Sequence, residues 1–215
     1  MDVTIIGAGN MGRGIGTRLV AGGHRVKIID SDADQAKDLA GELEGSAGRG
    51  GGAESGGAGD PISGDVVVLA VWFDGAQRAL ERYGDQLRGK VIVDISNPVD
   101  VDSFDRLVTP PDSSAAEELA KKAPEGARLV KAFNTTFAGT LVEGQVAGQP
   151  LDVFIAGDDD DAKETVAELA RGGGLNPIDA GPLRRARELE RLGFLHMAIQ
   201  DGLGTGYGSA VKIIA

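Results

Sequence analysis

The chain has 215 residues, of which 41% are hydrophobic, and this is enough for one domain with its own core or for one domain with a small appendage. A formal net charge of −11 argues against a nucleic-acid partner, and the absence of cysteine excludes disulfides and thiolate chemistry. No apolar run reaches the ~20 residues of a transmembrane helix and no signal-peptide pattern opens the chain, so we expect a cytoplasmic protein without a membrane partner.

Short apolar runs rich in β-branched residues alternate with amphipathic segments along the chain. The predicted strands are Val3–Ile6, Val26–Ile29, Val66–Ala70, Val91–Ile95, Leu129–Ala132, Val153–Ala156 and Asn176–Asp179. The predicted helices are Met11–Ala21, Ala33–Leu43, Ala76–Leu87, Ala115–Lys122 and Asp161–Arg171. Strands that are apolar throughout are typical of a parallel sheet covered on both faces. The alternation therefore predicts an α/β fold with a Rossmann-type, doubly wound and mostly parallel sheet.

Three further segments complete the predicted organisation. Residues 45–59 contain eight glycines and no large apolar side chain, which predicts a flexible surface loop. Ser113 or Ser114 is the predicted N-cap of the helix that follows. The 36 residues after Asp179 suffice for one long helix and a Gly-rich final segment. We therefore expect a dinucleotide-binding domain over 1–180 and a C-terminal helical appendage over 181–215.

The first predicted strand runs directly into GAGNMG, which has the spacing G-x-G-x-x-G, and a helix follows at once. Gly7 permits the tight turn, Gly9 lets a diphosphate approach the backbone, and Gly12 lets the helix pack closely on the strand. The phosphates then meet the helix N-terminus. Because a strand precedes the motif and a helix follows it, the match is more specific than the spacing alone. This turn, with Asn10 and Met11 inside it, is the predicted dinucleotide site.

Two further glycines, Gly14 and Gly16, lie inside that helix, where each costs up to ~1 kcal/mol relative to alanine. Close approach of the sheet or of the ligand would explain them. Tight helix–sheet packing alone is the alternative.

Asp30 follows the second predicted strand, 18 residues after the last glycine of the turn. An acidic residue at this place binds the adenosine ribose in NAD-binding folds. Ser31 and Arg13 can favour the 2′-phosphate of NADP instead, whereas Asp30 and Asp32 repel a phosphate. We therefore expect NAD, with NADP left open. The alternative for this segment is helix capping, since Ser31 and Asp34 have the spacing of a capping box.

Ligands of an open parallel sheet bind beyond the carboxyl ends of its strands. Val71 follows the third predicted strand there, and Trp72 and Phe73 can form an apolar wall for the nicotinamide or, alternatively, a core aromatic pair. Asn97 precedes Pro98, which favours an extended backbone that can direct the amide at the cofactor. An ordinary Asn-Pro turn is the alternative.

Four stretches carry a resemblance to a known family: IIGAGNMGRGIGTRLVAGGH (5–24), LAVWFDGA (69–76), LVKAFNTTFAGTL (129–141) and VFIAGDDDDAKETVAEL…GLNPIDAGPLRRARELE (153–190). The chain resembles the NADP oxidoreductases that reduce or oxidise the deazaflavin coenzyme F420, a family whose fold also occurs in ferric-reductase domains of metalloreductases. The resemblance implies a dinucleotide-binding sheet, a second cofactor stacked on the nicotinamide and, commonly, a homodimer through the C-terminal helices. It also implies that Asn134 and Thr135 lie near both rings, where Asn134 can orient a carboxamide or a ring carbonyl. A helix N-cap is the alternative role of Asn134.

The candidate site contains few acid–base groups, which is compatible with hydride transfer because that reaction needs stacking and alignment more than a proton donor. We predict an oxidoreductase that transfers a hydride between a nicotinamide dinucleotide and a flavin-like or deazaflavin (F420) partner. Two alternatives are a non-catalytic NAD(P)-binding redox sensor and a small imine or hydroxy-acid reductase. The acidic run 158–161 is interpreted as a helix start, so no metal site is predicted.

Arg184, Arg185 and Arg187 lie in the first turns of the C-terminal helix, where the helix dipole disfavours cations. Local ion pairs, Arg184 with Glu188 and Arg187 with Glu190, are one interpretation. A contact with the anionic tail of the second substrate is the other.

Overall fold

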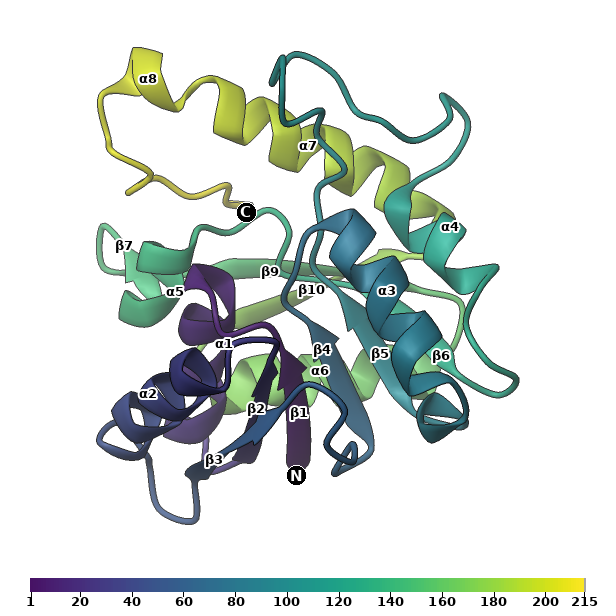
Figure 1. Ribbon diagram of the computed structural model, residues 1–215. Helices are drawn as coiled ribbons and strands as arrows, with labels where there is room; N and C mark the ends of the chain where they lie inside the picture. Colours follow the sequence, from purple (N-terminus) through teal and green to yellow (C-terminus); the bar gives the residue numbers. More distant parts are fainter. Residues whose placement is uncertain (215) are drawn as a thin grey trace.

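Eight strands form one sheet in the order β10-β9-β6-β5-β4-β1-β2-β3 in the computed structural model, which describes residues 1–214 (Figure 1). Their bounds are β1 Asp2–Ile6, β2 Arg25–Asp30, β3 Gly52–Gly57, β4 Val66–Leu69, β5 Val91–Asp94, β6 Arg128–Lys131, β9 Asp152–Gly157 and β10 Asn176–Gly181. The first six are parallel in the order 3-2-1-4-5-6 that is typical of dinucleotide-binding sheets. The strand β9 runs antiparallel to β6, and β10 runs parallel to β9. The predicted mostly parallel, Rossmann-type sheet is thus confirmed.

Helices cover both faces of this sheet. Their bounds are α1 Asn10–Ala21, α2 Ala33–Glu44, α3 Phe73–Tyr83, α4 Ala115–Ala120, α5 Ala138–Glu143, α6 Asp160–Gly172, α7 Ala186–Ala198 and α8 Gln200–Leu203. Two 3-10 turns, Gly84–Leu87 and Leu183–Arg185, and a small hairpin of β7 (Gln145–Val146) and β8 (Gln149–Pro150) complete the elements. Alternate strand residues divide the core: Val68 packs with α1, α2 and α6, whereas Leu69 packs with α3 and α4.

Side-chain caps fix where three of the helices begin. Ser114 caps α4 by accepting from the Glu117 amide, as predicted, and Asp159 caps α6 in the predicted acidic run. At α2 the helix-capping alternative is confirmed, but with Asp32 as the N-cap residue, accepting from two amides of the first turn, so the capping box of Ser31 and Asp34 is wrong. The helix α1 begins after Gly9 with no side-chain cap and no acidic residue in its first turn.

The predicted flexible loop at 45–59 is wrong in its second half. Residues Gly52–Gly57 form the edge strand β3, which pairs in parallel with β2 along six residues, from Arg25 opposite Gly52 to Asp30 opposite Gly57. Periodicity could not reveal this strand because glycine carries no side chain. The glycines that lead into the strand have a packing reason, since a Cβ at Gly48 or Gly51 would overlap the carbonyl oxygens at the end of α1.

Two carboxylates cover the outer edge of β3. Glu44 Oε1 accepts from the Ala53 amide at 2.5 Å, and Asp60 Oδ2 accepts from the Gly57 amide at 3.0 Å. Edge strands with free amides are templates for pairing with other chains, so these two carboxylates protect an edge strand in which three of the six residues are glycine.

The C-terminal segment crosses the carboxyl ends of the parallel strands (Figure 1). The helix α7 lies across this end of the sheet, and the residues after α8 run back toward the start of β9. There Asp152 accepts from the Ile213 amide at 2.7 Å and from Lys212 Nζ at 2.6 Å. None of the helices within residues 1–214 has the length and apolar character needed to span a bilayer.

Gly14 and Gly16 owe their identity to neighbouring helices, not to the sheet or a ligand. A Cβ at Gly14 would lie 2.8 Å from both the Ala138 carbonyl oxygen and Leu141 Cβ, and one at Gly16 would lie 2.7 Å from Leu43 Cδ1.

The variant Gly14→Ala should therefore lose about 1–3 kcal/mol in free energy of unfolding, measured by urea denaturation. Gly41→Ala, where a Cβ meets nothing within 4 Å on the exposed side of α2, should gain up to ~1 kcal/mol. Equal effects of the two variants would contradict this assignment.

Candidate functional site

The loops that carry the predicted site residues all leave the carboxyl ends of neighbouring strands. Gly7 follows β1, Asp30 ends β2, and Val71 follows β4, while the segments at 96–98 and 133–136 follow β5 and β6. With strands spaced ~4.8 Å apart, the five loops extend over about 19 Å of the sheet edge. The structure therefore brings every predicted site residue to one end of the sheet, at the point where the strand order reverses.

A cavity of about 180 Å³ lies at the β1, β2 and β4 end of this edge. Four predicted cofactor residues line it: Gly7, Asp30, Ser31 and Val71. The same cavity is also lined by residues of α3 that the sequence did not single out, namely Arg78, Arg82 and Tyr83.

The three glycines of the first turn have different environments. Gly7 has φ +117°, and a Cβ there would lie 2.9 Å from Val71 Cγ1 and overlap the Ala70 carbonyl. A Cβ at Gly12 would overlap the Gly7 carbonyl. These two positions need glycine because the protein itself fills the space. Gly9 has an ordinary extended conformation, and a Cβ there would meet nothing within 4 Å.

The carboxylate of Asp30 is held against the glycine turn. Its Oδ2 accepts from the Ala8 amide at 2.7 Å, and its Oδ1 accepts from the Asp32 amide at 3.0 Å and from Ser31 Oγ at 3.1 Å. Burial raises the pKa of Asp30, but the hydrogen bonds from Ala8, Asp32 and Ser31 outweigh it, so the pKa lies below its usual value. The carboxylate is thus kept ionised and oriented.

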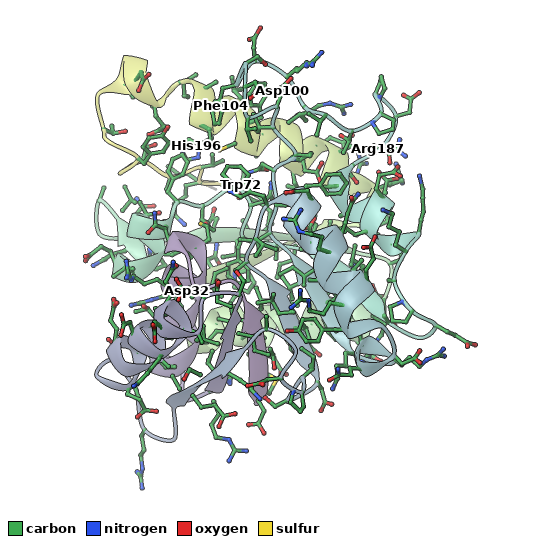
Figure 2. The ribbon with its side chains drawn as sticks, viewed as in Figure 1. Asp32, Trp72, Asp100, Phe104, Arg187 and His196 are labelled. Atoms are coloured by element: carbon green, nitrogen blue, oxygen red, sulfur yellow. The ribbon has the colours of Figure 1, made fainter. Side chains whose placement is uncertain are left out.

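The aromatic pair of the next loop is divided between solvent and core. Trp72 is 56% exposed and lies below α7, on the same side of the molecule as His196 (Figure 2). Phe73 is the first residue of α3, earlier than the predicted start at Ala76, and packs on the core of that face. The core alternative therefore fits Phe73 alone.

Asn97 and Asn134 form a doubly hydrogen-bonded pair beneath α7. Asn97 Nδ2 donates to the Asn134 carbonyl oxygen at 2.8 Å, and Asn134 Nδ2 donates to Asn97 Oδ1 at 2.9 Å. Asn134 Nδ2 also donates to the Leu189 carbonyl oxygen in α7 at 2.8 Å. The N-cap alternative for Asn134 is wrong, because α5 begins after Phe137. Pro98 is buried directly after this pair.

Two buried polar atoms near this pair have no partner in the described part of the chain. They are Asn134 Oδ1 and Ser96 Oγ. Buried polar atoms are almost always hydrogen-bonded, so an unpaired acceptor and an unpaired hydroxyl at the same sheet edge call for a ligand or water.

The segment 133–136 is backbone-strained. Phe133 has φ +62°, a left-handed conformation that is unfavourable for a large side chain, and its carbonyl accepts from Thr136 Oγ1 at 2.6 Å. Thr135 is buried, and its carbonyl lies 3.3 Å from His196 Nδ1. Its hydroxyl therefore does not line an open surface in this conformation.

A buried ion cluster joins α7 to the sheet, and the sequence analysis missed it. Lys131 Nζ lies 2.8 Å from Asp94 Oδ2 and 2.8 Å from Glu190 Oε1, with all three side chains buried, and it also donates to the Ser96 carbonyl. Glu190 accepts in turn from the Ala115 amide at 2.9 Å. The available signal was a lysine at the end of an otherwise apolar strand.

The cluster shifts the pKa values of two members. Burial alone would lower the pKa of Lys131, but the charges of Asp94 and Glu190 raise it above its usual value. Burial, together with the charge of Asp94, raises the pKa of Glu190 even though Lys131 opposes the shift.

Gly193 is a second residue that the sequence analysis missed. A Cβ there would lie 2.7 Å from Asn97 Oδ1 and 2.8 Å from the Asn134 carbonyl oxygen. An isolated glycine inside an apolar helical pattern was the available signal. It lets α7 lie directly on the asparagine pair.

The arginines at the start of the C-terminal helix have other partners than predicted. Arg187 forms a two-pronged pair with Glu117 at 2.8 and 2.6 Å, not with Glu190, and its position is labelled in Figure 2. Arg185 lies 3.9 Å from Glu188, and no ion pair of Arg184 is found within residues 1–214.

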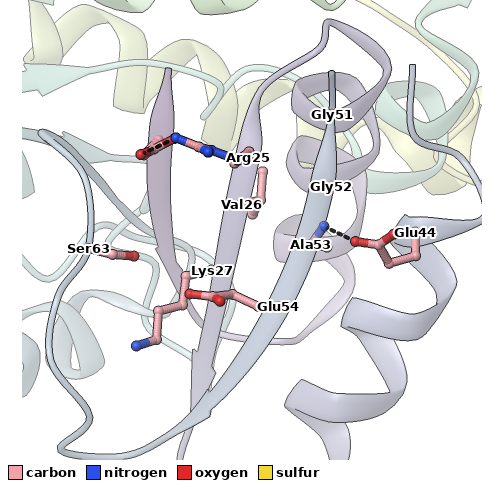
Figure 3. Close-up of a pocket in the computed structure, with 10 residues that line it drawn as sticks. Arg25, Val26, Lys27, Glu44, Gly51, Gly52, Ala53, Glu54 and Ser63 are labelled. Atoms are coloured by element: carbon pink, nitrogen blue, oxygen red, sulfur yellow. Dashed lines mark hydrogen bonds and ion pairs between the residues drawn. The ribbon is translucent and has the colours of Figure 1, made fainter. Parts of the chain in front are cut away.

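A larger hollow of about 470 Å³ lies away from this edge, over the start of β2 and β3 (Figure 3). Four of its five charged side chains bind one another or the backbone, Glu54 being the exception within residues 1–214. Arg25 pairs with Asp2 at 2.7 Å, Lys27 donates to the Pro61 carbonyl at 3.0 Å, and Glu44 accepts from the Ala53 amide. It lies at the amino ends of the strands, where ligands of such sheets do not bind, so it is not the candidate site. No group of three or more potential metal ligands is found in residues 1–214.

Comparison with known proteins agrees with this geometry. Residues 2–98 match the family described as NADP oxidoreductase, coenzyme F420-dependent. An F420-dependent NADP reductase of Methanothermobacter thermautotrophicus is 34% identical over 203 residues, which cover 89% of this chain and 86% of that protein. The chain belongs to this family. Family membership makes it an oxidoreductase.

Two further relatives extend the comparison. The rat metalloreductase STEAP3 is 33% identical over 190 residues, covering 88% of this chain but only 36% of that longer protein. A crystal structure from Arthrobacter sp. FB24, assigned as an F420-dependent NADP-reductase, superimposes with a TM-score of 0.84 at 28% identity and covers 99% of each chain. The likeness to the family therefore includes the C-terminal segment as well as the sheet.

The ion cluster predicts a strong effect of removing its lysine. Lys131→Met should lower the free energy of unfolding by about 3–5 kcal/mol, because two carboxylates would remain buried beside each other without a cation. The measurement is chemical denaturation at neutral pH. Lys121→Met, which removes an exposed pair with Glu118, is the control and should change stability by less than ~1 kcal/mol. A small effect of Lys131→Met would show that the cluster does not hold α7 in place.

Proposed function

We propose that this family member binds a pyridine nucleotide with its diphosphate on the Gly7–Gly12 turn and transfers a hydride between the nicotinamide and a flavin-like or deazaflavin second substrate. One observation carries the proposal: the open space at Gly9 beside a helix N-terminus that no side chain caps. The names of the family and of its methanogen member support both the pyridine nucleotide and coenzyme F420.

Gly9 supports diphosphate binding because no packing contact or backbone angle requires a glycine there, although glycine is also acceptable as the N-cap residue of α1. Its backbone has φ −75° and ψ −171°, which any residue adopts, and a Cβ would have free space. A side chain at Gly9 would instead occupy the space in front of the first amides of α1. Those amides and the helix dipole favour a bound anion.

The asparagine pair supports a site for the nicotinamide end. Asn134 Nδ2 already donates both of its protons and Asn97 Oδ1 already accepts one, so Asn134 Oδ1 is the amide oxygen left to accept, and Ser96 Oγ is free to donate or accept. A carboxamide, which has both donors and an acceptor, would satisfy such groups. Asn134, proposed from the sequence as a residue at the reacting rings, would then orient the nicotinamide without moving a proton.

The residues around the site suit hydride transfer better than acid–base chemistry. A bound nicotinamide supplies the hydride donor or acceptor, and the chain needs only to align it and exclude water. His196 is not placed to donate a proton: burial lowers its pKa, and its Nε2 is hydrogen-bonded to Ser209 Oγ at 2.8 Å. Trp72, which is largely exposed at this end of the sheet, offers an apolar face on which a flat second substrate can stack.

The variant Gly9→Val tests the binding site. It should fold with a loss of no more than about 1 kcal/mol, since the position has space and ordinary backbone angles and valine is only a poorer N-cap than glycine. It should bind NADH or NADPH at least about tenfold more weakly. Gly139→Ala, at another open position, is the control for stability and should bind normally. Titrations follow the fluorescence of the single tryptophan, Trp72, or of the reduced nicotinamide.

Turnover is tested with the same protein by following absorbance of the reduced nicotinamide while FMN, FAD and coenzyme F420 are supplied in turn. Oxidation with one of these acceptors, lost in Gly9→Val, is the expected result. Tight nucleotide binding without oxidation by any acceptor would favour the redox-sensor alternative instead. Absence of binding to any pyridine nucleotide would contradict the proposal itself.

We also propose that two copies associate through the C-terminal helices. Leu195, Ile199 and Leu203 are 58%, 42% and 52% exposed and recur every four residues, so they form one apolar stripe. Light scattering on the wild-type chain should give the mass of a dimer, and Leu195→Lys with Leu203→Lys should give a monomer that still folds. A monomeric wild-type protein would contradict this part of the proposal.

A further inference from the structure

Three groups at the loop between β2 and α2 decide whether it can hold the 2′-phosphate of NADP, and in this chain each of them is hydrogen-bonded within the protein. They are the carboxylate of Asp30, the hydroxyl of Ser31 and the N-terminal amides of α2. Asp30 and Ser31 line the cavity at the adenosine end of the candidate site, and α2 begins two residues after Ser31.

The Asp30 carboxylate has one acceptor position left. Its two oxygens offer about four lone-pair positions. Asp32 N and Ser31 Oγ occupy two positions on Oδ1, and Ala8 N occupies one on Oδ2. The remaining position on Oδ2 can accept from a ribose hydroxyl. An ionised phosphate has no proton to donate and would meet the carboxylate as a like charge.

Neither Ser31 nor α2 is free to compensate that repulsion. The single hydroxyl proton of Ser31 is donated to Asp30 Oδ1. Two of the first three amides of α2, those of Asp34 and Gln35, donate to Asp32 Oδ1 at 3.0 and 3.2 Å, and the capping carboxylate adds a negative charge beside the Ala33 amide. A helix N-terminus is an anion site only while its amides are unpaired. Arg13, the cation expected to help, is paired with Glu42 at 3.0 Å.

Two arginines of α3 are the remaining cations of this cavity. Arg78 is paired with Asp74 Oδ2 at 2.7 Å, whereas no ion pair of Arg82 is found in residues 1–214. Arg82 is therefore the only lining cation without an acidic partner in the described structure, and it lies on α3, across the cavity from the β2–α2 loop.

We infer that the adenosine end of this site selects the nucleotide that lacks the 2′-phosphate, so that the chain uses NADH in preference to NADPH, with Asp30 as the specificity-determining residue. The inference rests on the proposed function, because it concerns the same site. It departs from the NADP named in the family's description, and the β2–α2 loop is the part of this chain that accounts for the departure.

The experiment measures dissociation constants of NADH and NADPH for the wild-type chain by quenching of Trp72. NADH should bind at least about tenfold more tightly, which corresponds to ~1.4 kcal/mol. In competition, 5′-AMP should displace NADH at lower concentration than 2′,5′-ADP does. NADPH binding as tightly as NADH, or more tightly, would overturn the inference while leaving the proposed function intact.

Variants then locate the selectivity. Asp30→Asn keeps an acceptor for the Ala8 amide but removes the charge, so it should weaken NADH, strengthen NADPH and bring the two constants within a few-fold of each other. Asp32→Asn removes the same charge two residues away while retaining the cap of α2, and it should leave the preference unchanged. If Asp32→Asn abolished the preference equally, general charge repulsion and not Asp30 would be responsible.

Arg82 of α3 provides the converse test, because it is the cation that could bind a 2′-phosphate. Arg82→Gln should affect NADH and NADPH equally if the inference is correct. A selective loss of NADPH binding would show that Arg82 holds a 2′-phosphate and would overturn it. If the wild-type chain bound neither nucleotide, the proposed function would fail, and that result is distinct from binding with the reverse preference.

Discussion

The buried charge of Lys131 constrains how the end of the chain meets the sheet. A fully buried ammonium is unfavourable unless it is paired, and here the partners come from two distant elements, Asp94 of β5 and Glu190 of α7. The helix can therefore slide or rotate only by leaving a charge uncompensated. About one turn after Glu190, Gly193 lies on the Asn97–Asn134 pair. The ion cluster therefore fixes the position of α7, and α7 covers the candidate site.

The sequence was sufficient for those parts of the molecule that depend on local pattern. The strand, glycine turn and helix from β1 to α1 carry their own signals, and the apolar strands and the N-caps Ser114 and Asp159 could be located within a residue or two. The strand β3 could not, because it is held by backbone pairing with β2 and by glycines just before it, Gly48 and Gly51, that pack on the end of α1. The partners of Arg187 and Glu190 could not either, since spacing along one helix predicts pairs on that helix, whereas both side chains turn to other elements.

The division of roles among the glycines explains why one motif predicted both fold and site. Gly7 and Gly12 are required by the chain's own backbone, so they indicate the fold, whereas no packing contact within the chain requires a glycine at position 9. In the β2–α2 loop, structure and ligand preference depend on the same residues. Asp32 caps α2 and Asp30 binds the Ala8 amide of the glycine turn, so the charges that stabilise the loop also determine which ligand groups it can bind. Within one family, such a loop can change its ligand preference while the sheet remains the same.

The guarded edge of β3 has a consequence for how these molecules behave when crowded. A strand of small residues with bare amides would be an easy place for a second molecule to add its own strand, and repeated addition would build fibres. Glu44 and Asp60 occupy two of those amides from within the same chain. The strand can therefore remain rich in glycine at the edge of the sheet without exposing those two amides to a neighbouring molecule.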